Sequence, residues 1–436
     1  MRQTILALCL ITLTLASPAR AENLIDIYRL AQQNDPQLRG AEAARLAVLE
    51  SKPQSRALLF PTLSANVSTT ANRLDLTLPA SSGISHFNSN AYSLNLTQPV
   101  YHHDTYVQLR QSDARIAQAD ATFSAAEQDL MTRVATRYFD VLAAQDNLEF
   151  AHAEKKAIAQ QLDQSQQRFD VGLIAITDVQ EARARFDSAR AQEIDAERQQ
   201  SSTLEALREV TAQQHQGLSL LNDSIPLVTP DPANVEQWTD TALKQNLQIS
   251  AAQSGADVAR EEIERQRSGH YPSIDIVGSH AFSASGGGRF GSSEILNDTL
   301  TLQLSAPLYQ GGLITARTRE AAFRYNQALE TLEQQRRSVV RQTRDAYLGV
   351  NANISRVQAL KQSVVSNSTA LESTTAGLEV GTRTQVDVLD AQRELFRAQR
   401  DHARARYDYI LETLRLKQAA GTLSPADLEQ INTWLR

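Results

Sequence analysis

The chain has 436 residues, which by length alone would allow two or three ordinary domains. It contains only 17 glycines and 12 prolines and is 6% aromatic, while Ala, Gln, Arg, Glu and Leu are abundant, a bias typical of long helices and coiled coils. The formal net charge is -7 and no block of basic residues stands out, so the composition argues against a nucleic-acid partner.

Residues 1–21 have the pattern of a cleaved secretory signal. A basic residue precedes a short apolar run, and the small residues Ala19 and Ala21 occupy the minus-three and minus-one positions of a cleavage site. The mature chain is therefore expected to start at Glu22. The apolar run is too short to span a bilayer as a helix. It also contains Cys9, the only cysteine, so the mature chain would have no thiol, disulfide or thiol ligand for a metal.

The residues after the signal predict a helix followed by a β-hairpin. Residues 24–57 place apolar side chains at helical spacing, and we expect one helix there despite Pro36. The period then changes to two, and the residues become Thr, Ser, Asn, Leu and Tyr. Strands over residues 61–78 and 88–97, joined by a short turn, predict a hairpin within residues 61–98.

A very long helical stretch follows this hairpin. Residues 100–171 contain no glycine and no proline, and a helix of that length would span roughly 100 Å at about 1.5 Å per residue. Its apolar residues keep a three-four spacing with one slip, as in coiled coils. We expect a turn at Gly172, a return helix to about Gln214, and a proline-rich linker over residues 217–232.

The second half of the chain repeats this pattern. Residues 233–268 predict a helix, residues 272–306 predict a second hairpin, and a long helix follows to about Ala376. After a turn at Gly381, a return helix would extend to Ala420. The repetition predicts an internal duplication that covers nearly the whole mature chain.

The two turns carry the same residue types at one constant offset. The matched pairs are Gly172 with Gly381, Asp178 with Asp387, Glu181 with Asp390, and Ala182 with Ala391. We therefore divide the mature chain into a first repeat over residues 22–216, the linker over 217–232, a second repeat over 233–420, and a C-terminal segment over 421–436.

The hairpins suggest an assembly in a membrane. Two isolated hairpins leave open edges and are marginally stable in water. They become stable if several chains close their hairpins into one barrel. Strands of around ten residues or slightly more suit a tilted crossing of an outer membrane. The sequence therefore predicts a membrane-anchored tube with long helices at one end of a barrel.

Several stretches match a known family. They are the mature start Glu22-Asn-Leu24, the proline-bounded hairpins, Arg168-Phe-Asp-Val-Gly-Leu173 with Ile176-Thr-Asp-Val179, and Val380-Gly-Thr-Arg-Thr384 with Val386-Asp-Val-Leu-Asp390. On these residues the sequence resembles the TolC family of outer-membrane export ducts, from residue 22 to about residue 430. The Val-Gly-Thr-Arg stretch is the most specific of these motifs.

The resemblance implies a mainly helical fold with a β-barrel. Each chain of a homotrimer would supply four strands of a transmembrane barrel, which a long α-helical coiled-coil barrel continues across the periplasm. Residues near 215–245 and the C-terminal segment would form an equatorial belt. The implied function is the exit duct of tripartite efflux pumps or type I secretion systems, passively conducting drugs or unfolded proteins. The implied partners are outer-membrane lipid, a periplasmic adaptor (membrane fusion) protein and an inner-membrane ABC, RND or MFS transporter.

Two features depart from the family pattern. His102-His-Asp104 stands where the second half has Gln310-Gly-Gly312, so the join between strand and helix is expected to differ between the halves. Leu378 stands where members of the family carry a tyrosine that helps to lock the closed tip.

Two interpretations of the charged residues at the second turn remain open. Arg383, Asp387 and Asp390 are spaced four and three apart, so they share one face of the return helix. In the first interpretation Thr384 caps this helix and Asp387 lies at its third position, where a carboxylate favours the positive end of the helix dipole. In the second, three-fold symmetry collects the acids into rings, which select or trap cations.

The family resemblance assigns roles to the residues around both turns. It implies periplasmic entrance rings formed by Asp387 and Asp390. It implies a lock between neighbouring coiled coils formed by Arg383, Thr177 and Asp178. It implies tip turns that contact the adaptor, namely Val171, Gly172, Val380 and Gly381.

The sequence contains no catalytic constellation. His102 and His103 lack a third ligand at metal spacing, and Gly286-Gly-Gly288 precedes another loop rather than a phosphate-binding helix. We therefore expect no enzyme activity, metal or cofactor. The alternative to an export duct is a periplasmic coiled-coil scaffold or adaptor without a pore. Two membrane-length hairpins with apolar faces favour the duct, because a scaffold does not need them.

Overall fold

The computed structural model describes residues 21–78, 81–215 and 217–436. Almost all of the expected signal sequence lies outside the described residues. The chain forms two compact units. The helical unit comprises the described parts of Met1–Arg39, Glu127–Ala242 and Arg341–Arg436, and the sheet unit comprises Gly40–Ala126 and Leu243–Val340. The described residues are mainly helical and include four strands, as the sequence predicts.

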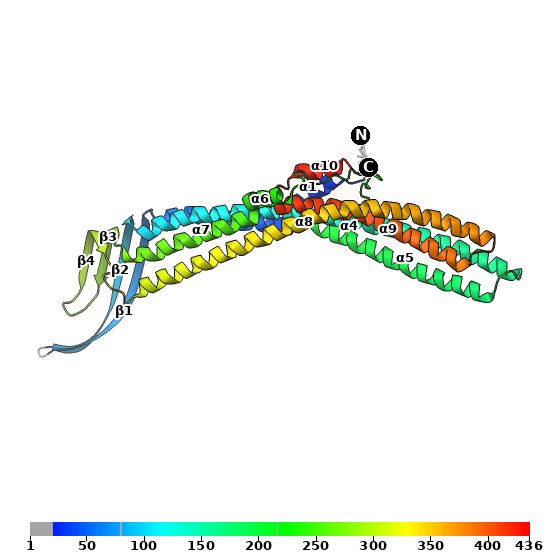
Figure 1. Ribbon diagram of the computed structural model, residues 1–436. Helices are drawn as coiled ribbons and strands as arrows, with labels where there is room; N and C mark the ends of the chain where they lie inside the picture. Colours follow the sequence, from blue (N-terminus) through cyan, green and yellow to red (C-terminus); the bar gives the residue numbers. More distant parts are fainter. Residues whose placement is uncertain (1–20, 79–80, 216) are drawn as a thin grey trace, which may run out of the picture. The chain divides into compact units, whose positions relative to one another are not determined.

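The sheet unit contains one antiparallel sheet of four strands (Figure 1). In spatial order these are β1 (Thr62–Leu78), β2 (Ser81–Tyr101), β3 (Ser273–Ser285) and β4 (Ser293–Ser305). The sequence predicted two separate hairpins, but β2 and β3 also pair with each other, with Tyr92 opposite Phe282. The open edges of this sheet therefore belong to β1 and β4.

The second strand is longer than its sequence predicts. Alternation favours a strand over residues 88–97, whereas β2 begins at Ser81 and ends at Tyr101. Its first half is mainly polar, with only Ile84 on one face and Phe87 on the other, so the alternation there is weak, but it continues the hydrogen-bonded ladder with β1. Its last residues pair with β3 across an irregular register between Pro99 and Tyr101. The following helix consequently starts three residues later than predicted.

The helix predicted over residues 24–57 is divided into three. These are α1 (Leu24–Asn34), α2 (Pro36–Leu49) and α3 (Ser51–Ala57). The first break has a local cause, because the residue before a proline disfavours the helical conformation. Asp35 is extended, with ψ of 119°, and its carboxylate accepts the Leu38 N–H at 2.8 Å. A single continuous helix was therefore a wrong prediction at this point.

The same break occurs at the start of the second repeat. The predicted helix over residues 233–268 is divided into α6 (Val235–Gln245), α7 (Leu247–Arg267) and a 3-10 turn, η1 (Ser268–His270). Asn246 separates α6 from α7, and its side chain accepts the N–H groups of Gln248 and Ile249 at 2.9 and 3.2 Å. Both repeats thus begin with an 11-residue helix. In each, the residue directly after this helix, Asp35 or Asn246, caps the start of the following helix.

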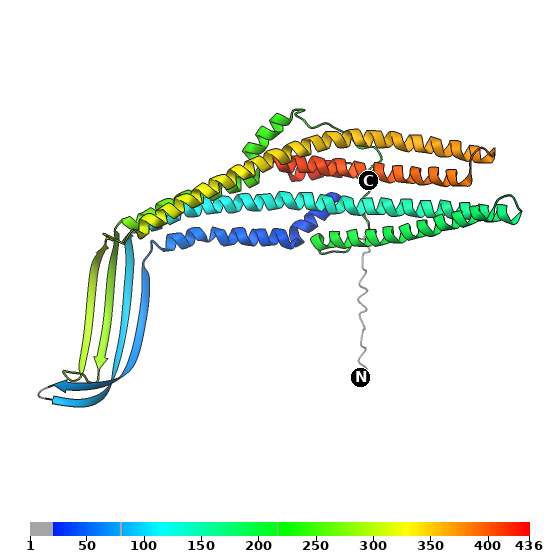
Figure 2. The ribbon, with the colours of Figure 1, turned by 60° about the horizontal axis from the view of Figure 1, so that its bottom comes forward.

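Four long helices carry the two predicted turns. They are α4 (His103–Asp170), α5 (Ile176–Thr211), α8 (Leu313–Glu379) and α9 (Gln385–Ala420). Within the helical unit α5 turns back along α4, and α9 turns back along α8 (Figure 2). Of these, α5 ends three residues before the predicted Gln214, because Ala212 adopts a left-handed conformation with φ of 59°. Among the described residues, no helix combines the length and the apolar character that a membrane-spanning helix needs.

The linker between the repeats packs against both ends of the described chain. Leu218 forms a parallel bridge with Glu22, and Leu221 forms an antiparallel bridge with Leu435. The last helix, α10 (Pro425–Asn432), lies in the same layer and contacts α1. Of the segments that the family resemblance assigned to an equatorial belt, residues 220–222 and the C-terminal segment are therefore neighbours within the helical unit.

Candidate functional site

The four-stranded sheet has one apolar face and one polar face. Side chains alternate between the two faces of a strand, so the register identifies which residues share a face. One row across the sheet consists of Val67, Tyr92, Phe282 and Leu296, and a polar row on the opposite face consists of Ser64, Asn95, Ser279 and Thr299. The apolar face is open to its surroundings: Val67 is 85% exposed and Leu300 is 81% exposed. A sheet in water would bury such a face.

The apolar band has a limited height along the strands. On β3 and β4 it extends from the pair Ile274–Leu304 to the pair Phe282–Leu296, and the next row in this direction ends at Glu294. This is about nine residues, close to the length of a strand that crosses an outer membrane.

An ion pair lies within this band. Nδ1 of His280 is 2.5 Å from Oδ1 of Asp298, and the two residues are direct partners across β3 and β4. Each side chain gives the other a hydrogen-bond partner, which reduces the cost of placing these polar groups on an apolar face. The apolar band therefore continues past this pair.

The two tip turns have the same backbone geometry. Gly172 and Gly381 both have φ of 78°, a left-handed conformation that glycine adopts without strain. In each turn the N–H that follows the glycine donates to a carbonyl five residues earlier, from Leu173 to Arg168 at 2.9 Å and from Thr382 to Gly377 at 2.8 Å. The neighbouring Val171 and Val380 are 70% and 75% exposed. Both turns thus present a valine to the outside.

The return helices start differently in the two repeats. Thr384 caps α9 through a reciprocal capping box with Asp387: its hydroxyl accepts the Asp387 N–H at 3.2 Å, and Oδ2 of Asp387 accepts the Thr384 N–H at 2.9 Å. This backbone donor, together with the Thr384 hydroxyl, lowers the pKa of Asp387. In the first repeat Ala175 takes the capping position of α5 and offers no side-chain hydrogen bond, although Asp178 occupies the matching third position. The capping interpretation of Asp387 is confirmed.

Asp390, the second predicted ring residue, is paired within the chain. Its Oδ1 lies 2.6 Å from Nη1 of Arg185 on α5 and 3.6 Å from Nη2 of Arg393 on its own helix. The other terminal nitrogen of Arg185 lies 3.4 Å from Oε1 of Glu181. Asp387 and Asp390 therefore have different surroundings. Arg185 is not a predicted site residue, because nothing in the local sequence pattern brings it to Asp390, 205 residues away.

Among the described residues, no hydrogen bond or ion pair within one chain joins Arg383 to Thr177 or Asp178, the residues predicted to form a lock with it. The side chain of Arg383 packs against Gly377, where even a methyl group would collide with it. Its charge also helps to lower the pKa of Asp387. In the part of the chain that the structure describes, no ion pair joins Arg383 to Asp178. A contact of Arg383 with Thr177 and Asp178 would therefore have to form between chains.

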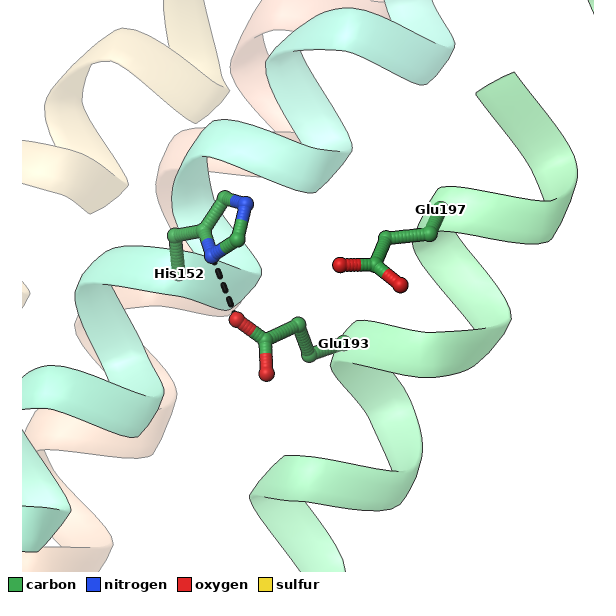
Figure 3. A group of neighbouring side chains, drawn as sticks. All are labelled: His152, Glu193 and Glu197. Carbon is green, nitrogen blue, oxygen red and sulfur yellow. Dashed lines mark ion pairs between the residues drawn. The ribbon is translucent and has the colours of Figure 1, made fainter. Parts of the chain in front are cut away.

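A second group of charged residues joins α4 to α5. His152, Glu193 and Glu197 place one possible metal ligand each within 4.8 Å of the others (Figure 3). However, the Lys155 ammonium already lies 2.6 and 2.5 Å from the two carboxylate oxygens of Glu193, which is buried. These contacts lower the pKa of Glu193. The group is therefore an interhelical bridge between one carboxylate and nearby basic side chains.

The joins between strand and helix differ between the repeats, as predicted. In the first repeat only His102 separates β2 from α4, and its Nε2 lies 2.9 Å from Oδ1 of Asp275 on β3. In the second repeat seven residues separate β4 from α8, and Gly311 and Gly312 adopt positive φ values of 59° and 84°. The neighbouring His103 packs edge-on against Tyr271. Both histidines thus have structural contacts at the base of the sheet.

An exposed apolar sheet face together with two long antiparallel helix pairs defines an outer-membrane channel subunit. The sequence profile of the outer membrane efflux protein family matches residues 27–213 and 238–422, one stretch in each repeat. The chain therefore belongs to the outer membrane efflux protein family, which is a family of channels rather than of enzymes, and it is an outer-membrane exit duct as the resemblance implied.

Individual relatives are similar to this protein over almost the whole chain. The outer membrane protein TolC of Vibrio cholerae serotype O1 is 41% identical over 426 residues, which are 97% of this chain and 96% of that protein. The alkaline protease secretion protein AprF of Pseudomonas aeruginosa is 30% identical over 96% of this chain and 88% of that protein. The crystal structure of the Campylobacter jejuni CmeC outer membrane channel has the same fold, with a TM-score of 0.78 at 17% identity, covering 95% of this chain and 90% of that one.

Proposed function

We propose that three copies of this chain form a passive export duct that serves as the exit of a tripartite efflux pump or a type I secretion system. The observation that carries this proposal is the inverted polarity of the sheet, whose apolar face is exposed and whose opposite face is polar. Lipid would cover the apolar face, and the polar face would line water.

The open edges of the sheet support closure between chains. The edge strands β1 and β4 present unpaired backbone groups, and such groups are strongly unfavourable in a membrane. Pairing β4 of one chain with β1 of the next satisfies them. Three chains with four strands each give a closed barrel of twelve strands, within the range of outer-membrane barrels. The six pairs of long helices, two from each chain, would continue this barrel through the periplasm.

The tip turns would form the inner end of the duct. Asp387 and its two symmetry copies would form an acidic ring at the entrance. Asp390 would form a second ring, whose negative charge is reduced by the ion pair with Arg185. Arg383 would meet Thr177 and Asp178 of a neighbouring chain and hold the tip closed. The exposed Val171–Gly172 and Val380–Gly381 turns would contact a periplasmic adaptor protein. That adaptor would link the duct to an inner-membrane ABC, RND or MFS transporter.

Membrane fractionation and bilayer recording test the proposal together. The protein should fractionate with outer membranes, cross-link as a trimer that resists mild detergent, and conduct ions in planar bilayers. Arg383→Ser should raise the single-channel conductance by loosening the tip, and Leu378→Tyr should lower it by adding a hydroxyl to the lock. A soluble monomer without conductance would exclude the duct and favour the scaffold. Unchanged conductance in both variants would exclude the lock while leaving the duct.

A further inference from the structure

The pair Arg185–Asp390 joins the two helix pairs of the helical unit near their turns. Arg185 lies on α5 of the first repeat and Asp390 on α9 of the second, and Nη1 and Oδ1 are 2.6 Å apart. The side chain of Arg185 is only 23% exposed, compared with 45% for Asp390. A short, partly buried guanidinium–carboxylate pair is stronger than a pair on an open surface.

Apolar packing beside this pair holds both helices in place. Leu389, which precedes Asp390, is buried in a cluster with Ile158 of α4 and Ala189 of α5, and Phe186, which follows Arg185, packs against this cluster. Leu389 is 3% exposed, so α9 is anchored against α4 and α5 at this level. The ion pair is therefore positioned by packing rather than by two flexible side chains that meet in solvent.

The charged groups around Asp390 balance its charge. Arg185 and Arg393 contribute two positive charges within 4 Å of it, Glu181 shares the guanidinium of Arg185, and Glu394 shares that of Arg393. Asp387, one turn earlier on α9, has its capping contacts with Thr384 and the nearby charge of Arg383. A carboxylate that is already paired attracts a passing cation less strongly than an unpaired one.

We propose that Arg185 sets the cation selectivity of the duct entrance by holding Asp390 against α5, so that Asp390 adds little negative charge to the acidic ring of Asp387. This inference rests on the proposed function. Arg185 is then a specificity-determining residue of the duct. We call its ion pair with Asp390 the latch, because it joins α5 of the first repeat to α9 of the second. Removing Arg185 would take the shorter of two cationic contacts from three Asp390 carboxylates, one in each chain, at the entrance.

Cation block of purified trimers in planar bilayers tests this inference, with hexaamminecobalt(III) as the probe on the tip side. In Arg185→Gln the concentration for half block should fall about tenfold, because Asp390 then keeps only its longer contact with Arg393, and less compensated carboxylates in a narrow site bind a trivalent cation more strongly. The matched control is Arg183→Gln, at an exposed arginine of the same helix. This variant should be blocked at the same concentration of the probe as the wild type. Arg185→Lys keeps the charge and should also stay within about twofold of the wild type.

The charge effect must depend on Asp390. In an Asp390→Asn background, Arg185→Gln should change the half-blocking concentration no further. Equal block in Arg185→Gln and wild type would overturn the inference, as would an Arg185→Gln effect that persists without the Asp390 carboxylate.

A second readout separates the latch from the duct. Thermal unfolding of the wild type, both single variants and the double variant gives the coupling between Arg185 and Asp390 without any conductance. If the wild type does not conduct, the proposed function and the role of Arg185 in selectivity are both excluded. Non-additive changes in melting temperature between the single and double variants would still establish the latch. Additive melting temperatures would reject the latch itself.

Discussion

Thr384 and Asp387 bond each other in both directions at the start of α9. The Asp387 N–H donates to the Thr384 hydroxyl at 3.2 Å, and the Thr384 N–H donates to the Asp387 carboxylate at 2.9 Å. The equivalent helix start in the first repeat has the acid, Asp178, but has Ala175 in place of the threonine. The internal duplication therefore provides a natural comparison between a capped and an uncapped copy of one turn.

Installing the missing cap should stabilise the first turn. Ala175→Thr places a hydroxyl three residues before Asp178, and we expect about 1 kcal/mol of stabilisation of the start of α5. Ala175 already has extended backbone angles, φ of -80° and ψ of 154°, so the change needs no backbone movement. Hydrogen exchange of the first amides of α5 measures the effect. Ala175→Val, which has the same shape without the hydroxyl, is the control, and equal protection in both variants would contradict the capping argument.

The two faces of β4 should respond differently to a positive charge. Leu300→Lys places an ammonium on the apolar face and should destabilise the folded, membrane-inserted protein by about 2–4 kcal/mol if it lies near the bilayer midplane. Thr299→Lys, one residue away on the polar face, should have little effect. The fraction of detergent-resistant trimer after reconstitution into lipid vesicles measures both variants. A similar loss in both would show that the faces are wrongly assigned.

The buried Tyr407 and the partly buried Asp146 form a pair, and replacing one partner should not have the same effect as replacing the other. The Tyr407 hydroxyl donates to Oδ2 of Asp146 at 2.7 Å, and burial raises the pKa of Asp146. Tyr407→Phe removes the donor and should lower the free energy of unfolding by about 1–3 kcal/mol. Asp146→Asn keeps an acceptor and removes a partly buried charge, so its melting temperature at pH 7 should equal or exceed that of the wild type.

The pH dependence of stability follows from the direction of this pKa shift. Because the pKa of Asp146 is higher in the folded state, that state binds more protons between the unfolded and folded pKa values. The contribution of Asp146 is therefore most favourable below its ordinary pKa and is lost as the pH rises through the folded pKa. Asp146→Asn should flatten this part of the stability profile in thermal unfolding between pH 4 and 7. A steeper acid-range profile in the variant would contradict the assignment.

Glu193 should contribute to the stability of the α4–α5 pair, whereas its neighbour Glu197 should not. Glu193 is buried against Lys155 and His152, while Glu197 is exposed. Glu193→Gln should lower the free energy of unfolding by roughly 1–2 kcal/mol, and Glu197→Gln should leave it unchanged. Since the pKa of Glu193 is lowered, its stabilisation is present above its ordinary pKa and is lost as the pH falls through the folded value.

Zinc ions provide a further readout for this group in thermal unfolding experiments. If Lys155 holds the Glu193 carboxylate, added Zn²⁺ should not raise the melting temperature of the wild type. A zinc-dependent increase that disappears in Glu193→Gln and Glu197→Gln would identify a metal site instead of a bridge.

The repeated architecture of this protein is determined locally, and the sequence alone predicts it well. Glycine and proline are absent over residues 103–170, so one long helix follows from propensity and periodicity. The left-handed conformation that a turn requires is supplied by Gly172 and Gly381, and alternating residues identify the strands. The apolar face of the sheet follows from the same alternation. These features depend on neighbours within a few positions, which a linear sequence displays directly.

The tertiary structure decided which distant residues meet. The pairing of β2 with β3 joins the two predicted hairpins into one sheet, and no local pattern specifies that Tyr92 stacks on Phe282. Asp387 and Asp390 look alike in the sequence, since both are acids on one face of one helix. Only the packing of α5 against α9 distinguishes them, because it brings Arg185 to Asp390 from 205 residues away and leaves Asp387 at the helix cap.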